Sequence, residues 1–114
     1  MPTILIVSVS EIVPFPVPNT PAPTREELLS RLRALALQSA NMRMEHPHLR
    51  LRLAQRGITM RQMLEVIQNG EVIDGPRLDK FGDWRIKLSR KVAGRRVQVV
   101  VAVMETYFVA VTVI

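Results

Sequence analysis

The chain has no cysteine among its 114 residues, which excludes disulfide bonds, thiolate catalysis and cysteine-ligated metal sites. Aromatic residues make up only 4% of the chain, with one tryptophan and one tyrosine. The two histidines, His46 and His48, flank a proline and have only Glu45 beside them as a further ligand. Because a protein metal site needs more ligands than this, the sequence predicts no metal ion and no cofactor.

Acidic residues are also scarce, with 10 Asp and Glu against 16 Lys and Arg, which leaves a net charge of +6. Thirteen of the sixteen cations are arginines, whose planar guanidinium suits phosphate and carboxylate groups. With 47% hydrophobic and 23% charged residues, the chain otherwise has the composition of a globular domain. The charge balance therefore favours a nucleic acid or an acidic protein as the partner.

Signals for export or membrane insertion are lacking as well. Residues 1–9 carry no basic residue ahead of their short apolar run. The longer apolar run at residues 97–114 is interrupted by Gln98, Glu105 and Thr106, and its valines favour a strand over a membrane helix. We therefore expect a soluble, cytoplasmic protein with no membrane partner.

Proline is concentrated in one segment, since five of the eight prolines lie between Pro14 and Pro23. Each proline fixes its backbone and lacks an N–H, so this segment predicts an extended linker rather than a helix. Residues 3–9 fit either a short strand or a tail. The expected organisation is an N-terminal strand or tail with a Pro-rich linker over residues 1–23, then a single domain over residues 24–114.

Helix signals begin at Thr24, which forms a capping-box pattern with Glu27 and predicts a helix ending near residues 39–41. The same pattern over residues 59–62 predicts a second helix, with Gly70 as its stop. Residues 48–58 are ambiguous, because leucines at 49, 51 and 53 alternate as in a strand. The flanking Pro47 and Gly57 favour a helix there.

Strand patterns follow Gly70, at residues 71–74, 84–88, 97–104 and 108–114, with a turn at residues 93–94. The first ends at the Asp-Gly-Pro sequence of residues 74–76. The third is almost entirely apolar, which predicts a strand covered on both faces. The fold class is therefore α+β: two or three helices, then an antiparallel sheet of three or four strands with helices on one face.

Two groups of residues are candidates for chemistry. His48, Arg52 and Arg56 are spaced four apart and would line one face of a helix, with His48 able to exchange a proton near neutral pH. Arg85 and Lys87 alternate with apolar residues and would lie on the polar face of a strand. The competing interpretation is that these arginines pair with carboxylates or form an ordinary solvated surface.

Several stretches carry a resemblance to a known family: HLRLRLAQRGI at 48–58, GEVI at 70–73, GDWR at 82–85, GR at 94–95, VQVVV at 97–101 and VTV at 111–113. Over roughly residues 24–114 the chain resembles the bacterial family called domain of unknown function 4258. It departs from the family at Gln62, where an Asp is frequent, and at Ile114, where an aromatic residue is frequent. The family is similar to the RelE-like and BrnT-like toxins found in toxin–antitoxin gene pairs.

This resemblance implies a toxin-like α+β domain that binds RNA, free or ribosome-associated, and cleaves it without metal, with a cognate antitoxin protein as partner. In such a mechanism His48, Arg52 and Arg56 would be catalytic, and Arg85, Lys87 and Tyr107 would contact the RNA. The alternative function is a non-catalytic basic module for nucleic acid or an acidic protein partner. A third interpretation is self-assembly as a homodimer through a sheet edge in the valine-rich last hairpin.

Overall fold

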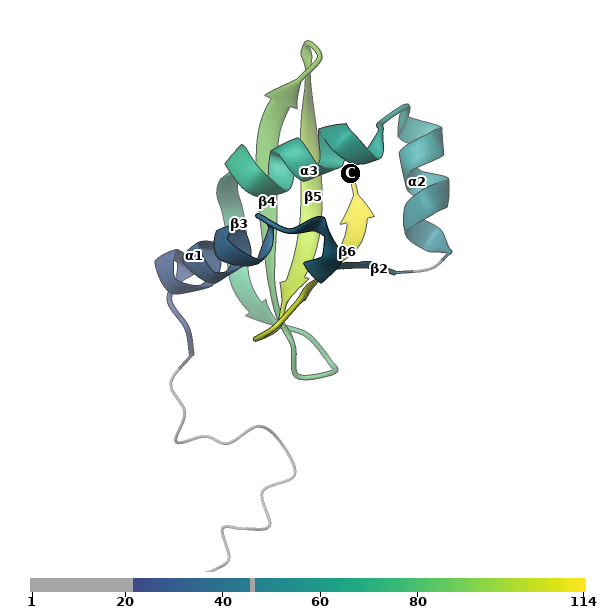
Figure 1. The fold of residues 1–114 in the computed structure, drawn as a ribbon. Coiled ribbons are helices and arrows are strands. Elements are labelled where there is room, and N and C mark those ends of the chain that lie inside the picture. Colours follow the sequence, from purple (N-terminus) through teal and green to yellow (C-terminus); the bar gives the residue numbers. More distant parts are fainter. Residues whose placement is uncertain (1–21, 46) are drawn as a thin grey trace, which may run out of the picture.

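The computed structural model describes residues 22–45 and 47–114, so the N-terminal strand or tail and most of the Pro-rich linker lie outside the described residues. Three helices pack against one sheet of five strands, whose order is β2-β6-β5-β4-β3 (Figure 1). The elements are α1 (Arg25–Leu35), a 3-10 turn η2 (Ser39–Asn41), β2 (Met42–Met44), α2 (His48–Arg56), α3 (Met60–Asn69), β3 (Glu71–Leu78), β4 (Trp84–Val92), β5 (Arg95–Val103) and β6 (Phe108–Val113).

The predicted α+β class is confirmed, with one strand more than expected. The additional strand is β2, which pairs in parallel with β6, whereas all other neighbours are antiparallel. The sequence suggested that the last hairpin forms an edge of the sheet. It does not, because β2 pairs with the outer side of β6. Within the described residues the two edge strands are β2 and β3.

Both predicted capping boxes are present. At the start of α1, the Thr24 hydroxyl accepts from the amide of Glu27 at 3.0 Å, and the Glu27 carboxylate accepts from the amide of Thr24 at 2.8 Å. At the start of α3, Thr59 and Gln62 make the same two bonds, each of 3.0 Å. Gln62 therefore fills a structural position. The first helix ends at Leu35, earlier than predicted, and η2 follows it.

The ambiguous segment is helical, because α2 buries every fourth residue rather than every second. Leu49 and Leu53 are 0% and 6% exposed, whereas Leu51 is 57% exposed. Gly57 ends the helix in the left-handed conformation with φ 65°. Gly70 ends α3 differently, in extended backbone, and a Cβ there would lie 2.5 Å from the carbonyl oxygen of Val66.

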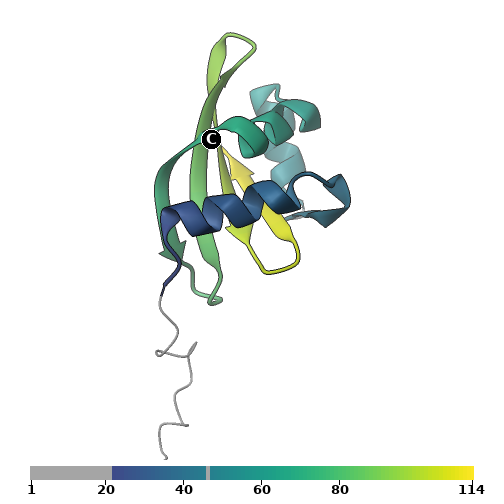
Figure 2. The ribbon, with the colours of Figure 1, turned by 60° about the vertical axis from the view of Figure 1, so that its left-hand side comes forward.

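The helices lie on one face of the sheet (Figure 2). Two side-chain bonds join α1 to α3: Arg33 donates to the carbonyl of Gly70, and Gln68 donates to the carbonyl of Ala36 at 2.9 Å. None of the helices in the described residues is long and apolar enough to cross a membrane. Buried side chains from both layers form one core that includes Leu28, Leu32, Leu49, Met63, Ile67, Ile86, Leu88, Val99, Val101 and Phe108.

The opposite face of the sheet, which we call the open face, corrects one expectation. In β5 the odd-numbered valines from Val97 to Val103 are buried in the core, and on the other side Ala102 is 3% exposed, whereas Val100 is only half-buried. The prediction that this strand is covered on both faces therefore holds at Ala102 and fails at Val100. β3 also continues past its predicted end to Leu78, and its pairing with β4 contains two register shifts. Within β3, Gly75 has a φ of 100°, and a Cβ there would lie 2.6 Å from the carbonyl oxygen of Arg85.

Candidate nucleic-acid interface

The open face carries a row of paired residues that crosses all five strands. Arg77 of β3 pairs with Arg85 of β4, which pairs with Ala102 of β5. Ala102 pairs with Val109 of β6, and Val109 pairs with Arg43 of β2. Directly paired residues share a face of the sheet, so this row places cations on both sides of two small apolar residues.

Further cations lie along the same face. Lys87 pairs with Asp74 on one side and with Val100 on the other. Lys91 pairs with Arg96, whose Nη1 donates to the Ser89 hydroxyl at 3.0 Å. From the strand registers, the open face thus presents six cations against the two carboxylates of Glu71 and Asp74: Arg43, Arg77, Arg85, Lys87, Lys91 and Arg96.

A cavity of about 270 Å³ opens on this face beside β3 and β4. Three cations, Arg77, Arg85 and Lys87, line it together with the two carboxylates of Asp74 and Asp79. Arg85 donates its Nε to Asp79 at 2.7 Å, and Arg77 donates its Nε to Asp74 at 2.8 Å. Both ion pairs therefore use the Nε–H, which holds the guanidinium planes and leaves the terminal NH₂ groups as donors.

Asp79 also organises the turn between β3 and β4. Its carboxylate accepts from the amides of Phe81 at 2.8 Å and Asp83 at 2.9 Å, in addition to the bond from Arg85. Burial on its own raises the pKa of Asp79. The two amides and the guanidinium outweigh it, so the pKa lies below its ordinary value. The anionic carboxylate thus holds Arg85 against the wall of the cavity.

The other edge of the open face carries the only tyrosine of the chain. Tyr107 directly precedes β6, and the guanidinium of Arg43 lies 4.2 Å from the centroid of its ring. The separation is that of a cation–π contact. A stacked arginine and tyrosine together offer the kind of flat surface on which an unpaired nucleobase can stack.

The predicted catalytic residues form a separate group. His48, Arg52 and Arg56 are all exposed and line one side of α2. The C-terminal end of this helix is held by Arg95, which donates to the carbonyl of Gly57 at 2.8 Å and also to that of Arg56. The helix therefore presents the three side chains as an exposed ridge along one side.

The two predicted groups lie on different parts of the molecule. Leu49 and Leu53 of α2 pack into the core that Ile86 and Leu88 line from the sheet, whereas the side chains of Arg85 and Lys87 leave β4 on the opposite side. The structure brings Arg85, Lys87 and Tyr107 to the open face and keeps His48, Arg52 and Arg56 together on α2. It does not place both groups in one row.

The sequence did not single out four cations of the open face. Arg43 and Arg77 lie on edge strands, and Lys91 and Arg96 lie on either side of the turn at residues 93–94. The alternation of exposed Arg43 with half-buried methionines is the signal for β2, but three residues are too few to identify a strand. Within residues 22–45 and 47–114, no three His, Asp or Glu side chains gather as metal ligands.

The fold and the open face together define a small α+β domain with one basic sheet surface. The model of the family described as domain of unknown function (DUF4258) matches residues 46–114, more than half of the chain, and the protein belongs to that family. The match begins just before α2, so α1 and β2 precede it, although the sequence resemblance suggested a start near residue 24. No curated protein matches the chain.

Proposed function

We propose that this protein is a toxin-like RNA-binding domain that holds a single RNA strand against the open face of its sheet. The observation that carries the proposal is the set of six cations on the open face, three of which line a cavity of about 270 Å³ together with the carboxylates of Asp74 and Asp79. A phosphate group in this cavity would accept hydrogen bonds from the terminal NH₂ groups of two oriented arginines.

The composition of the face favours a single strand over a duplex. Between the cations of β4 and Arg43 of β2 lies a strip formed by Val100, Ala102 and Val109. Val100 and Val109 are half-buried and can contact the flat faces of bases, while the flanking cations donate hydrogen bonds to the phosphates. Arg43 and Tyr107 add a stacking surface at the edge, and unpaired bases are the groups that such surfaces bind.

A salt titration tests the binding. Each phosphate contact releases counterions, so the affinity for a short oligouridine should fall steeply with salt, by a slope of roughly 0.7 per contact for a single strand. The double variant Arg85→Ala/Lys87→Ala should lower both the affinity and the slope. The control Arg50→Ala/Arg61→Ala removes the same charge from exposed positions on α2 and α3 and should leave most of the binding. Equal losses in the two double variants would refute a dedicated face.

RNA cleavage is the second proposed activity, and the exposed ridge of His48, Arg52 and Arg56 on α2 favours it. In a metal-free cleavage the 2′-oxygen bonds to the adjacent phosphorus and the bond from phosphorus to the 5′-oxygen breaks. His48 would transfer a proton to or from these oxygens, and the two arginines would neutralise the charge on the phosphate. The RNA would then have to reach α2 as well as the open face.

Cleavage is tested with purified protein and RNA in EDTA, including ribosome-bound message. The expected result is cutting that His48→Ala or Arg56→Ala abolishes while thermal unfolding stays cooperative. RNA that stays intact under all conditions removes the cleavage and leaves a non-catalytic binding module. A cognate antitoxin or a second copy of the chain would pair with an exposed strand, and β3 is the longer of the two edge strands in the described residues.

A further inference from the structure

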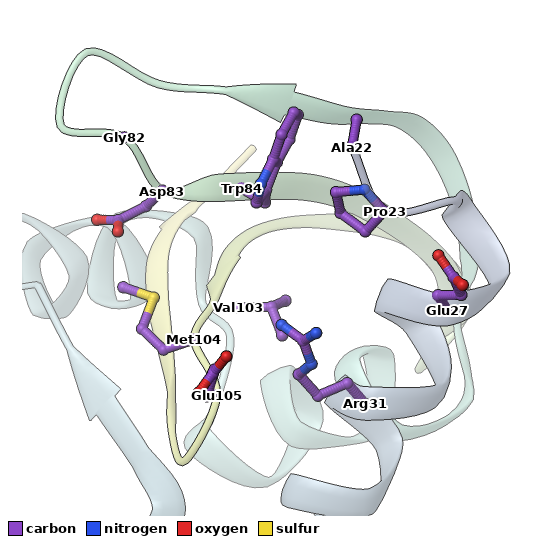
Figure 3. A pocket seen from close by; sticks show the side chains of 10 residues that line it. All are labelled: Ala22, Pro23, Glu27, Arg31, Gly82, Asp83, Trp84, Val103, Met104 and Glu105. Carbon is purple, nitrogen blue, oxygen red and sulfur yellow. The ribbon is translucent and has the colours of Figure 1, made fainter. Parts of the chain in front are cut away.

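We infer that a second pocket, at the end of the sheet, binds a guanine base of the RNA strand. It has a volume of about 700 Å³ and lies between α1, the start of β4 and the end of β5 (Figure 3). Arg31, Trp84, Val103 and Glu105 are among its lining residues. The inference rests on the proposed RNA binding, because it names the base that the strand would insert.

The walls of the pocket combine apolar and charged groups. Trp84 and Pro23 form one wall, and Arg31 projects its guanidinium from α1 on the other side, near Glu105 of the turn between β5 and β6 (Figure 3). Trp84 is only half-buried, although it packs against the core. An aromatic wall of this kind offers a surface on which a purine can pack.

The two charged groups line the same pocket without bonding to each other. No ion pair or hydrogen bond joins Arg31 or Glu105 to any other residue in the described part of the chain. Glu27, which also lines the pocket, is already engaged by the amide of Thr24. The pocket thus offers one guanidinium and three carboxylates, those of Glu27, Asp83 and Glu105.

Guanine is the base whose edges match this pair. Its O6 and N7 accept two bonds from an arginine, and its N1–H and N2–H₂ groups donate two bonds to a carboxylate. Adenine and cytosine do not carry both an edge with two adjacent acceptors and an edge with two adjacent donor groups. Uracil has a single donor. A pocket that offers the guanidinium of Arg31 and an unpaired carboxylate such as that of Glu105 therefore favours guanine.

The pocket lies at the end of the sheet on the side that α1 covers, and two turns connect it to the open face. The turn over residues 79–83, which Asp79 and Arg85 organise, leads directly into Gly82, Asp83 and Trp84 of the pocket. The turn that carries Glu105 leads into Tyr107, the stacking residue of the open face. A nucleotide at this end of the strand would therefore turn around the edge of the sheet and enter the pocket.

The experiment uses the fluorescence of Trp84, because it is the only tryptophan of the chain. The full-length protein is titrated with guanosine, adenosine, cytidine and uridine, none of which carries a phosphate. We expect guanosine to quench the emission with at least about tenfold tighter binding than the other nucleosides, given the discrimination of one bidentate base contact. Glu105→Gln and Arg31→Ala should abolish this preference, and Arg61→Ala, an exposed arginine on α3, should retain it.

The same variants are then tested with oligouridine, which lacks guanine and reports on the open face alone. Glu105→Gln should leave oligouridine affinity within about twofold and should cancel the gain from one guanine in the oligonucleotide. Equal quenching by all four nucleosides, or none at millimolar concentration, overturns the guanine pocket whatever oligouridine does. If the unmodified protein does not bind oligouridine, the proposed RNA binding by the open face is overturned, whereas guanosine selectivity would still stand.

Discussion

Replacement of Asp79 by alanine is the sharpest test of how the open face is built. The Asp79 side chain is 12% exposed and accepts bonds of 2.8, 2.9 and 2.7 Å from two amides and the Arg85 guanidinium. At about 1 kcal/mol for each bond, Asp79→Ala should lower the free energy of unfolding by about 3 kcal/mol. For a domain of this size the midpoint of thermal unfolding should fall by roughly 10–20 °C.

Asp74→Ala is the matched control for this prediction. Asp74 pairs with Arg77 at 2.8 Å, but the two side chains are 39% and 74% exposed. Exposed ion pairs contribute little, so this variant should be much less destabilising than Asp79→Ala. Urea unfolding followed by tryptophan fluorescence measures both variants. If Asp79→Ala costs no more than Asp74→Ala, the carboxylate does not organise the turn and the argument fails.

The contribution of Asp79 to the free energy of unfolding should also depend on pH. The folded-state pKa of Asp79 lies below its ordinary value of 3.8, because the two amides and Arg85 outweigh the opposing effect of burial. The stabilisation by the Asp79 carboxylate is therefore complete above about pH 4–5 and is lost as the pH falls through the folded-state pKa. The difference in unfolding free energy between the wild type and Asp79→Ala should shrink in acid. A difference that stays constant down to about pH 2 would contradict the lowered pKa of Asp79 in the folded state.

Two further predictions use matched pairs within the chain. Leu49→Ala should destabilise the protein by about 3 kcal/mol, since Leu49 is fully buried, whereas Leu51→Ala should cost less than about 0.5 kcal/mol; equal losses on urea unfolding would argue for a strand at this position. Gly75→Ala and Gly94→Ala both place a Cβ at positive φ, but only the former meets a backbone oxygen, at 2.6 Å. Gly75→Ala should therefore be the more destabilising by at least about 1 kcal/mol, and calorimetry showing the reverse order would contradict the packing of β3 against β4.

The sequence predicted most accurately the features that local chemistry determines. The capping boxes at Thr24 and Thr59 need only residues three positions apart, and both form. The alternation of Arg85 and Lys87 with buried neighbours likewise gave their face of the sheet correctly. β2 escaped prediction because a strand of three residues exists only through its pairing with β6, which lies more than sixty positions later in the chain.

The candidate site shows the same division. The spacing of His48, Arg52 and Arg56 predicted that the three residues share one side of α2. That spacing could not predict where α2 packs relative to β4. The position of α2 depends instead on Leu49 and Leu53 packing into the shared core. Neither the bond from Arg85 to Asp79 nor the contact between Arg43 and Tyr107 could be predicted locally, because turn geometry and strand pairing create them.

The open face and the core are two consequences of one strand register. In β4, a shift of one residue would send Arg85 and Lys87 into the helices and expose Ile86 and Leu88. Burying unpaired cations costs far more than the small gain of any single surface contact, so packing of the core holds the cations on the open face. The face on which the cations lie is therefore set by packing of the core, and the bond from Arg85 to Asp79 then orients one of them. Substitutions that remove Lys87 or Arg96 should alter RNA affinity while leaving the fold intact, which makes the proposed function separable from stability.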